Sequence, residues 1–312
     1  MGERHFEMEV AAPFRLDLTV WVLRRRAHNA VDDWDGLSYR RALVLGARPM
    51  ALAVRQIGEA PVAVLSVEMS GAGVTHDAAV EVEVRRVLDR MLGLSVDLTG
   101  FYDLAELDER LAPLAKRFRG VRPTRFPTVF EAVVNAVVCQ QLSLDVGVHL
   151  LNRVAGRYAV TEECGVRSPC GFPTPAQLAV AEVVELRSLG LSTTKARVLV
   201  DIARRVSEGD LNLEFLADLD DDHASRILLS LAGIGRWSTE YILLRGLGRL
   251  HVLPGDDVGA RNNLQRRFAL GAPLDYDAMA ELARSWWPYG GLVYFHLLLD
   301  SLVDDVEQME VV

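Results

Sequence analysis

The first third of the chain contains several stretches in which apolar and polar side chains alternate with a period of two. That period is typical of half-buried strands, and it predicts a strand over residues 16–23. Residues 40–44 and 50–57 are predicted to pair as a hairpin, because the Gly46-Ala47-Arg48-Pro49 segment between them has the composition of a turn. Residues 61–69 are predicted to form a further strand.

Residues 77–92 instead carry apolar side chains at helical spacing, which predicts a helix; these are Val80, Val84, Val87, Leu88 and Met91. Strands followed by a covering helix predict a small antiparallel α+β domain over residues 1–97. Strand patterns then stop, and short helical patterns broken by glycine and proline predict an all-helical domain over residues 98–312. The predicted fold class is therefore α+β, with a sheet domain followed by a helical domain.

The helical domain is organised around a short break between two apolar-periodic segments, Leu231-Ala232-Gly233-Ile234-Gly235. Glycines on both sides of Ile234 permit backbone torsions that other residues reach only with strain, so the turn can be tight. Such a turn aims backbone N–H groups at the start of the next helix, and a helix N-terminus attracts anions. We therefore expect Gly233, Ile234 and Gly235, followed by Arg236, to contact a phosphate, with the Ile234 side chain on the inner face.

Two aromatic residues follow this break: Trp237 comes directly after it, and Tyr241 falls four residues later on the same helical face. One interpretation is a pair of core rings, which is the usual role of aromatic residues at this spacing. The other is a slot for a base extruded from a duplex, because aromatic faces replace the stacking that the base loses. We favour the slot because the break adjoins it, and a cationic purine would gain further from an aromatic face.

Asp257 lies twenty residues after Trp237, in a Pro/Gly-containing loop ahead of a helix predicted over residues 260–268. A carboxylate there, favoured by the helix dipole, could stabilise positive charge on a sugar that is losing its base, or position the attacking water. The alternative is that Asp256 or Asp257 only caps the helix, which is the usual role of aspartate before a helix. The aspartate pair alone favours the cap, but the spacing of Asp257 from the hairpin and from Trp237 reverses this preference. We therefore predict that Asp257 is catalytic and that Asp256 is the cap.

Together, the hairpin, Trp237 and the later aspartate resemble the helix-hairpin-helix DNA glycosylase superfamily, and within it the bacterial alkylpurine glycosylases of the 3-methyladenine-DNA glycosylase II type. Residues 126–127, 136–143, 172–191 and 286–296 also fall in the family's order, so the resemblance covers essentially the whole chain. It implies that the second aspartate is catalytic. It also implies a monofunctional enzyme, because relatives that nick the strand have a lysine at the position of Trp237.

The resemblance assigns residues 140–143 to a DNA-probing loop, with Ser143 as a good helix N-cap. Gln140 is then a DNA contact, and Gln141 or Leu142 is the wedge that fills the gap left by the extruded base. Gln141 could hydrogen-bond the orphaned base, whereas Leu142 could pack inward, and both alternatives stay open.

The resemblance also implies a monovalent cation at the hairpin, held by the backbone carbonyls of Leu229, Leu231 and Ile234, with no cofactor required for catalysis. Two positions depart from the family pattern, because Val258 and Leu298 stand where other members have pocket aromatics. The base pocket would then rest mainly on Trp237 and Tyr241. Four residues near the end of the helical domain are expected in the core: Trp286, Trp287, Tyr289 and His296.

Composition narrows the class of protein. The chain has 312 residues, 50% of them apolar and 25% charged, which are ordinary values for a globular protein of two domains. No apolar run is long enough to span a bilayer, and the charged start MGERHFEMEV lacks the apolar core of a signal peptide, so we expect a cytoplasmic protein. Its cysteines, Cys139, Cys164 and Cys170, have no CxxC spacing, which argues against a disulfide framework, a zinc site and a four-cysteine iron–sulfur cluster. Cys139 is expected in the core.

The net charge of −9 argues against tight non-specific DNA binding, although basic residues gather locally. One basic segment spans residues 115–130, and another contains Arg261, Arg266 and Arg267. Residues 24–26 are three consecutive arginines, which we interpret as a solvated strand end or, alternatively, as a DNA contact.

The resulting hypothesis is a monofunctional DNA glycosylase that excises alkylated purines from double-stranded DNA and leaves an abasic site. We expect a monomer that acts at the bacterial nucleoid, with no membrane partner. One alternative is a glycosylase for deaminated or oxidised bases, since pocket shape decides the substrate. The other is a non-catalytic DNA-binding module that uses the hairpin as a phosphate grip; such a module would not require Asp257 or an aromatic slot.

Overall fold

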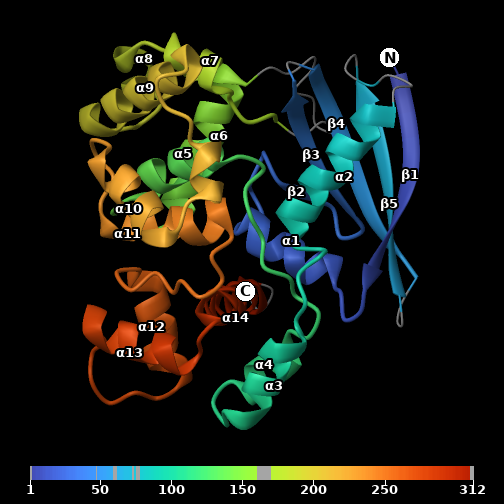
Figure 1. Ribbon diagram of the computed structural model, residues 1–312, viewed down its shortest axis with the longest axis vertical. Helices are drawn as coiled ribbons and strands as arrows, with labels where there is room; N and C mark the ends of the chain where they lie inside the picture. Colours follow the sequence, from blue (N-terminus) through green and yellow to red (C-terminus); the bar gives the residue numbers. More distant parts are fainter. Residues whose placement is uncertain are drawn as a thin grey trace.

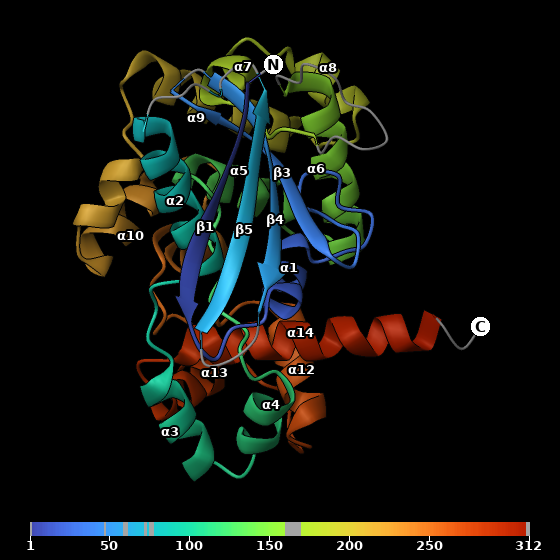
Figure 2. The same cartoon turned by 90° about the vertical axis from the view of Figure 1, so that its right-hand side faces the viewer.

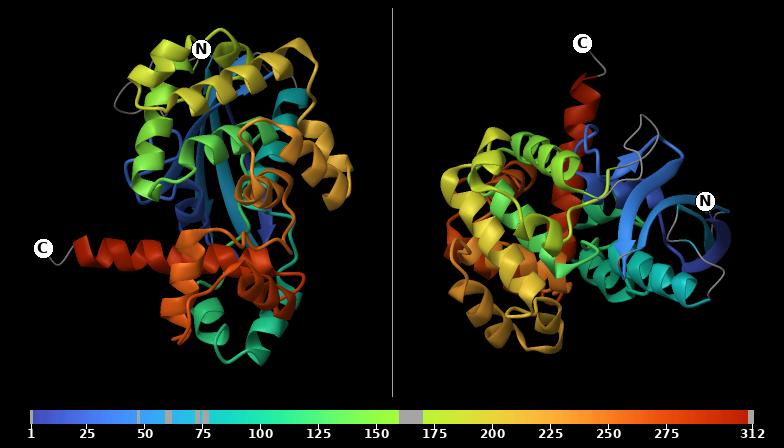
Figure 3. Two further views of the ribbon diagram at one scale, coloured as in Figure 1. Left: turned by 90° about the vertical axis from the view of Figure 1, so that its left-hand side faces the viewer. Right: turned by 90° about the horizontal axis from the view of Figure 1, so that it is seen from above.

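The computed structural model describes residues 2–46, 48–58, 62–71, 74, 78–159 and 170–309. Seen from above, a sheet lies on one side of the molecule and helices fill the other side (Figure 3). Cys164 lies outside the described residues, whereas Cys139 packs against the helical core, as predicted. No helix in the described part of the chain is long and apolar enough to cross a membrane.

The sheet has five antiparallel strands in the order β1-β5-β4-β3-β2. The strands are β1 (Gly2–Ala11), β2 (Asp33–Trp34), β3 (Ser38–Leu45), β4 (Arg48–Ile57) and β5 (Val62–Gly71). Helix α2 (Ala78–Leu92) runs along the sheet (Figure 1), and its apolar side chains share one hydrophobic core with alternate residues of the strands. The predicted hairpin, the strand after it and the helix that follows are all confirmed, although Ala47, Pro61 and Asp77 lie outside the described residues.

The predicted strand over residues 16–23 is wrong, because this segment forms helix α1 (Leu16–Arg24). Leu16, Val20 and Leu23 face the core of the sheet, whereas Val22 belongs to a core of the helical region. A helix that is buried on two sides lacks a wide polar stripe. Its few polar residues can then alternate with apolar ones, which is the pattern expected of a strand.

Sequence analysis also missed β1. Its Phe6 and Val10 are buried between exposed residues, and that alternation was the available signal.

The remainder of the chain is helical, as predicted, and no strand is found among its described residues. The helices are α3 (Thr99–Leu107), α4 (Ala112–Arg117), α5 (Val129–Cys139), α6 (Leu144–Tyr158), α7 (Pro175–Ala179), α8 (Val183–Ser188), α9 (Thr193–Glu208), η1 (Glu214–Asp218), α10 (Asp221–Ser230), α11 (Arg236–Ile242), η2 (Leu243–Leu247), α12 (Val258–Arg267), α13 (Tyr276–Ser285) and α14 (Gly290–Met309). Ser143 caps α6, as predicted. Helix α14 crosses the end of the sheet and projects from the body (Figure 2).

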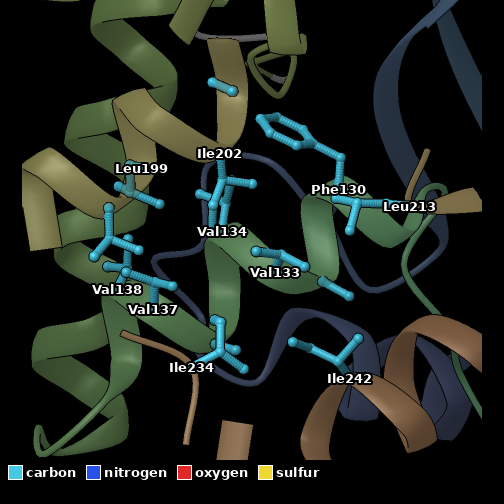
Figure 4. Close-up of a cluster of buried hydrophobic side chains, with 14 of the residues drawn as sticks. Phe130, Val133, Val134, Val137, Val138, Leu199, Ile202, Leu213, Ile234 and Ile242 are labelled. Atoms are coloured by element: carbon cyan, nitrogen blue, oxygen red, sulfur yellow. The ribbon is translucent and has the colours of Figure 1, made fainter. Parts of the chain in front are cut away.

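The helical region contains two hydrophobic cores. The first lies around α5, which packs against α9 and the hairpin helices (Figure 4). The second joins α3 and α4 to α12, α13 and α14. Val252 packs against both cores, so the segment from η2 to α12 passes from one to the other. Asp257, at the end of this segment, therefore lies where the two halves of the helical region meet.

The predicted domain boundary between residues 97 and 98 stays a prediction. Two features connect the regions on its two sides: Val22 of α1 belongs to a helical core, and buried Arg41 of β3 pairs with buried Glu131 of α5 at 2.5 Å.

Candidate functional site

The break at residues 231–235 is a hairpin between α10 and α11, and its two glycines serve different purposes. Gly233 has φ +79°, and a side chain there would meet Val198 at 2.7 Å, so its predicted special torsion is confirmed. Gly235 has φ −103° and ψ −173°, which any residue adopts, so the torsional argument is wrong at this position. A Cβ at Gly235 would point into open space, which leaves room for a ligand to approach the backbone. Ile234 is buried in the core, as predicted (Figure 4).

The loop between α5 and α6 is tied to this hairpin. Gln140 donates its amide hydrogens to the Gly233 carbonyl at 2.8 Å and to the Ser238 hydroxyl at 2.7 Å. Gln141 and Leu142 are exposed next to it, and Gln141 has φ +55°, an uncommon value for a residue other than glycine. The side chain of Leu142 is 39% exposed, so the alternative that it packs inward is wrong.

Trp237 and Tyr241 are brought together as predicted. Their rings stack with centroids 5.2 Å apart and an angle of 27° between the planes. Tyr241 is buried, and its hydroxyl accepts a hydrogen bond from Arg25 at 3.1 Å. Trp237 is half-buried, which leaves part of the indole accessible at the edge of the core.

Asp257 uses its two carboxylate oxygens differently. Oδ1 accepts the Ala260 N–H at 2.8 Å, so Asp257 is the N-cap of α12. Oδ2 accepts the indole N–H of Trp237 at 3.1 Å and the hydroxyl of Tyr294 at 3.3 Å. Capping and a role beside the aromatic pair are therefore compatible, because each uses one oxygen.

The prediction that Asp256 caps the helix is wrong. Asp256 faces the other way and forms ion pairs with Arg236 at 2.6 Å and Arg261 at 2.8 Å. The hydrogen bond from Arg236 is the largest cause of the lowered pKa of the Asp256 carboxyl. Arg236 is thus engaged with the loop, although its side chain remains 55% exposed.

A second set of contacts fixes the backbone of this loop at Gly255. Glu240 accepts the Gly255 N–H at 2.8 Å through one oxygen and the Tyr276 hydroxyl at 2.7 Å through the other. Arg261 donates to the Gly255 carbonyl at 2.7 Å. A Cβ on Gly255 would lie 2.7 Å from the Tyr276 ring, so only glycine fits beneath it. Burial raises the pKa of Glu240, and burial together with Glu240 raises that of Tyr276 to about 12.

Sequence analysis missed Tyr294 at this site. It lies on α14, is buried, and its hydroxyl donates to Asp257, so Tyr294 joins Trp237 and Tyr241 among the aromatic residues near this carboxylate. Burial beside Asp257 raises the pKa of Tyr294 well above its ordinary value. The only signal was an aromatic residue on an apolar helix, which is equally typical of a core.

Three of the four residues that were predicted in the core near the end of the helical domain do lie in it or against it. His296 is buried, and burial lowers its pKa to about 4. Trp286 is also buried, and Tyr289 packs against the same core. The prediction is wrong for Trp287, which is 68% exposed.

Four of the arginines that were considered as DNA contacts serve the fold instead. Arg24 and Arg25 are each only 4% exposed, so neither interpretation of the arginine run holds for them. In the basic segment at residues 115–130, Arg122 is buried and donates to two backbone carbonyls, and Arg125 donates to the Gly246 carbonyl at 3.0 Å. Burial lowers the pKa of Arg125 to about 10.

The hairpin carries the three backbone carbonyls that the resemblance assigns to a cation, at Leu229, Leu231 and Ile234. Helix α10 ends at Ser230, so Leu229 in its last turn and Leu231 at its C-cap carry carbonyls beyond the regular helical ladder. The Leu231 carbonyl accepts the Ile234 N–H at 3.1 Å, which leaves its second lone pair for another partner. Carbonyl oxygens are the ligand type that hard cations prefer, so this donor set suits the expected monovalent cation.

Comparison with known families identifies the hairpin and its surroundings. The family model of the HhH-GPD superfamily of base excision DNA repair proteins matches residues 134–289, which is half of the chain. The chain belongs to this superfamily. The matched residues include the loop between α5 and α6, the hairpin, Trp237 and Asp257.

Several relatives are similar over longer stretches. A DNA-3-methyladenine glycosylase of Bacillus subtilis is 26% identical over 215 residues, which is 69% of this chain and 71% of the relative. DNA-3-methyladenine glycosylase 2 of Escherichia coli is 31% identical over 170 residues, which is 54% of this chain and 58% of the relative. The solved 3-methyladenine DNA glycosylase from Archaeoglobus fulgidus has a TM-score of 0.83 at 29% identity, over 94% of this chain and 97% of that chain.

Proposed function

We propose that this protein is a monofunctional DNA glycosylase that excises alkylated purines of the 3-methyladenine type from double-stranded DNA. The observation that carries the proposal is the Asp257 carboxylate, with one oxygen fixed by a helix N-terminus and the other beside Trp237 and Tyr294. Similarity to the Archaeoglobus fulgidus enzyme over nearly the whole chain supports the reaction class. The names of the curated relatives support the substrate class.

In this proposal Asp257 acts on the sugar. Breaking the bond between base and sugar builds positive charge on the sugar ring, and a preorganised carboxylate stabilises that charge without having to reorient. Asp257 also positions the water that attacks the anomeric carbon and accepts its proton. The stacked pair of Trp237 and Tyr241 receives the extruded base, whose lost stacking it replaces.

The placement of the two lysine amines supports monofunctionality. A glycosylase that also nicks the strand needs an amine to form a Schiff base with the sugar. The chain has two lysines, Lys116 and Lys195. Lys195 donates to the carbonyls of Val138 and Gln140 at 2.9 Å and 2.6 Å, and exposed Lys116 lies in α4, so neither is placed at Asp257.

The hairpin is proposed as the DNA grip. The backbone N–H groups near Gly235 and the exposed side chain of Arg236 would contact a phosphate, and a monovalent cation on the hairpin carbonyls would neutralise it. Gln141 and Leu142 are both exposed candidates for the wedge. Gln140 supports this loop through its hydrogen bonds to the hairpin.

The proposal also includes that the protein acts as a monomer on chromosomal DNA.

One assay tests the proposal directly. Duplexes that carry 3-methyladenine or 7-methylguanine, prepared by methylation, are incubated with the protein, and free base is measured. We expect base release, strand breaks only after alkali, and no covalent adduct after borohydride. Binding without base release would overturn the proposal in favour of the non-catalytic DNA-binding module. A trapped adduct would contradict monofunctionality alone.

A further inference from the structure

Two histidines and an aspartate from different parts of the chain converge at the surface of the molecule. His28 lies in the segment between α1 and β2, whereas Asp145 and His149 lie one turn apart on α6. One imidazole nitrogen from each histidine and one carboxylate oxygen all lie within 4.8 Å of one another. The cluster contains no cysteine, so the cysteine spacing that argues against a zinc site does not bear on it.

The three side chains approach one another without hydrogen bonds between them. Nδ1 of His28 lies 3.8 Å from the Asp145 carboxylate and Nε2 of His149 lies 3.7 Å from it, both beyond hydrogen-bond reach. These separations are close to the edge of a coordination tetrahedron, which is about 3.3 Å for bonds of about 2.0 Å. In the described part of the chain, Nε2 of His28 is buried with no hydrogen-bond partner. Such an unpartnered buried atom is uncommon and often marks a ligand site.

The two imidazole rings are stacked, with centroids 3.9 Å apart and an angle of 10° between the planes. Each nitrogen binds a metal in the plane of its own ring, so one ring must turn before both can bind the same ion. The His149 side chain is 54% exposed and can turn without disturbing the core. The backbone of His28 is fixed, because its carbonyl accepts the Asn152 amide at 2.6 Å and the Ala30 N–H donates to the Asn152 oxygen at 2.9 Å.

The charges around the cluster decide which class of ion fits. Burial and the neighbouring His149 lower the pKa of His28, so this imidazole is neutral at neutral pH, as a metal ligand must be. Arg26 shares the carboxylate, with its Nε 3.8 Å from Asp145 Oδ1, which weakens binding that depends on charge alone. Two of the three ligands are nitrogens, whereas Mg²⁺ and Ca²⁺ prefer oxygen. A borderline transition-metal ion therefore fits best.

We propose that His28, Asp145 and His149 bind one divalent transition-metal ion such as Zn²⁺, with the fourth position left to water. The ion joins the segment after α1 to the first two turns of α6. Closing this long stretch of chain stabilises the folded state, because the ion binds only when the three ligands are together. Helix α6 begins soon after the exposed residues Gln141 and Leu142, so the ion also fixes the end of that loop.

The test uses the untagged chain without DNA, so its result does not depend on the proposed function. Protein freed of metal by a chelator is titrated with Co²⁺, whose visible absorption is intense in a tetrahedral site and weak in water. We expect saturation at one ion per chain and displacement by Zn²⁺. The melting temperature should rise by roughly 3–8 °C with Zn²⁺ at about a hundredfold excess over its dissociation constant.

Variants show whether the ion occupies this cluster. His28→Gln and His149→Gln should each lower Co²⁺ affinity by roughly a hundredfold or more, because even the loss of an outer-shell partner costs about 10–100-fold. The exposed position of His149 means that His149→Gln should keep the metal-free melting temperature of the wild type. The matched control is His223→Gln, which removes a histidine of α10 that pairs with Asp220 at 2.7 Å and should leave affinity unchanged.

Three results would overturn the inference. The first is a Co²⁺ titration of the wild type without saturable absorption. The second is unchanged affinity in both His28→Gln and His149→Gln, which would place the ion elsewhere. The third is a loss of binding in His223→Gln alone, which would assign the ion to the Asp220 pair.

Discussion

The two faces of α11 make different contacts with the loop at residues 255–257. On the outer face, Arg236 and Glu240 hold Asp256 and the backbone of Gly255 through ion pairs and hydrogen bonds. On the inner face, Trp237 donates to Asp257 and stacks on Tyr241. The adjacent aspartates are divided in the same way, so one carboxylate anchors the loop and the other faces the aromatic site.

The surroundings of the two faces differ in what a substitution costs. The Arg236–Asp256 pair is partly exposed, so water screens the attraction between its charges. The inner face is bordered by buried rings, where interactions with charge are stronger because the local dielectric constant is lower. We therefore expect inner-face substitutions to affect chemistry and outer-face substitutions to affect mainly the position of the loop.

The largest effect is expected at Asp257. Asp257→Asn removes the charge but keeps an N-cap of equal quality, so the fold should remain intact. Excision should fall by roughly a hundredfold or more, the scale seen when one preorganised electrostatic group is lost. Binding to lesion DNA should persist or tighten, since a negative charge near phosphates is removed. Single-turnover base release measures the excision rate, and thermal denaturation measures the stability of the fold. A near-normal excision rate would show that Asp257 is not catalytic.

Trp237 should come next. Trp237→Ala removes base stacking, which contributes on the order of 1–3 kcal/mol per base. It also removes the indole N–H group that donates to Asp257. Excision should fall by roughly 5–150-fold, more than duplex binding does. Trp237→Phe keeps a ring but loses the N–H group, and should give an intermediate loss. If the alanine variant excises normally, the ring pair is only core.

The hairpin glycines lie just before α11 and sharpen the comparison, because they should affect binding rather than chemistry. Gly235→Val fills open space, so it should weaken binding to lesion and undamaged duplexes alike by about tenfold, with little change in melting temperature. Gly233→Val should lower stability as well, since valine resists φ +79° and would meet Val198. Fluorescence anisotropy with both duplexes measures the effect. A loss confined to the lesion duplex would contradict a phosphate contact.

A smaller effect is expected from the support on the outer face. Tyr276→Phe keeps the ring over Gly255 but removes the hydroxyl that Glu240 accepts. A hydrogen bond to a carboxylate contributes about 1.5–3 kcal/mol, but this one acts on excision only through the position of the loop, so the rate should fall by less than roughly tenfold without a change in DNA affinity. If Tyr276→Phe excised as slowly as Asp257→Asn, the two faces of α11 would not have separate effects on loop position and on chemistry.

The smallest effect is expected at Asp256, the matched control for Asp257. Asp256→Asn weakens two partly exposed ion pairs and should cost about 0.2–1 kcal/mol of the free energy of unfolding. Excision should stay within about threefold of the wild-type rate. The reverse pattern, with Asp256→Asn inactive and Asp257→Asn near normal, would show that the catalytic assignment belongs to Asp256.

Local signals were sufficient for much of the fold. The strand hairpin around Gly46, the helix at residues 77–92 and the N-cap Ser143 follow from turn composition, periodicity and capping, which depend on neighbours within a few residues. The strand predicted at residues 16–23 failed for the opposite reason. Helix α1 lies between two cores, and burial on both sides removed the polar stripe that marks a helix.

The sequence by itself determined the hairpin, the stacked pair of Trp237 and Tyr241, and the loop with two aspartates, because spacing along one helix or turn fixes these relations. Only the tertiary structure decided which aspartate faces the rings. It alone brought Tyr294 of α14 to Asp257, and Arg25 at the C-cap of α1 to Tyr241. Those pairs are separated by 37 and 216 residues along the chain, and contacts at such distances arise from how helices pack, which no local pattern encodes.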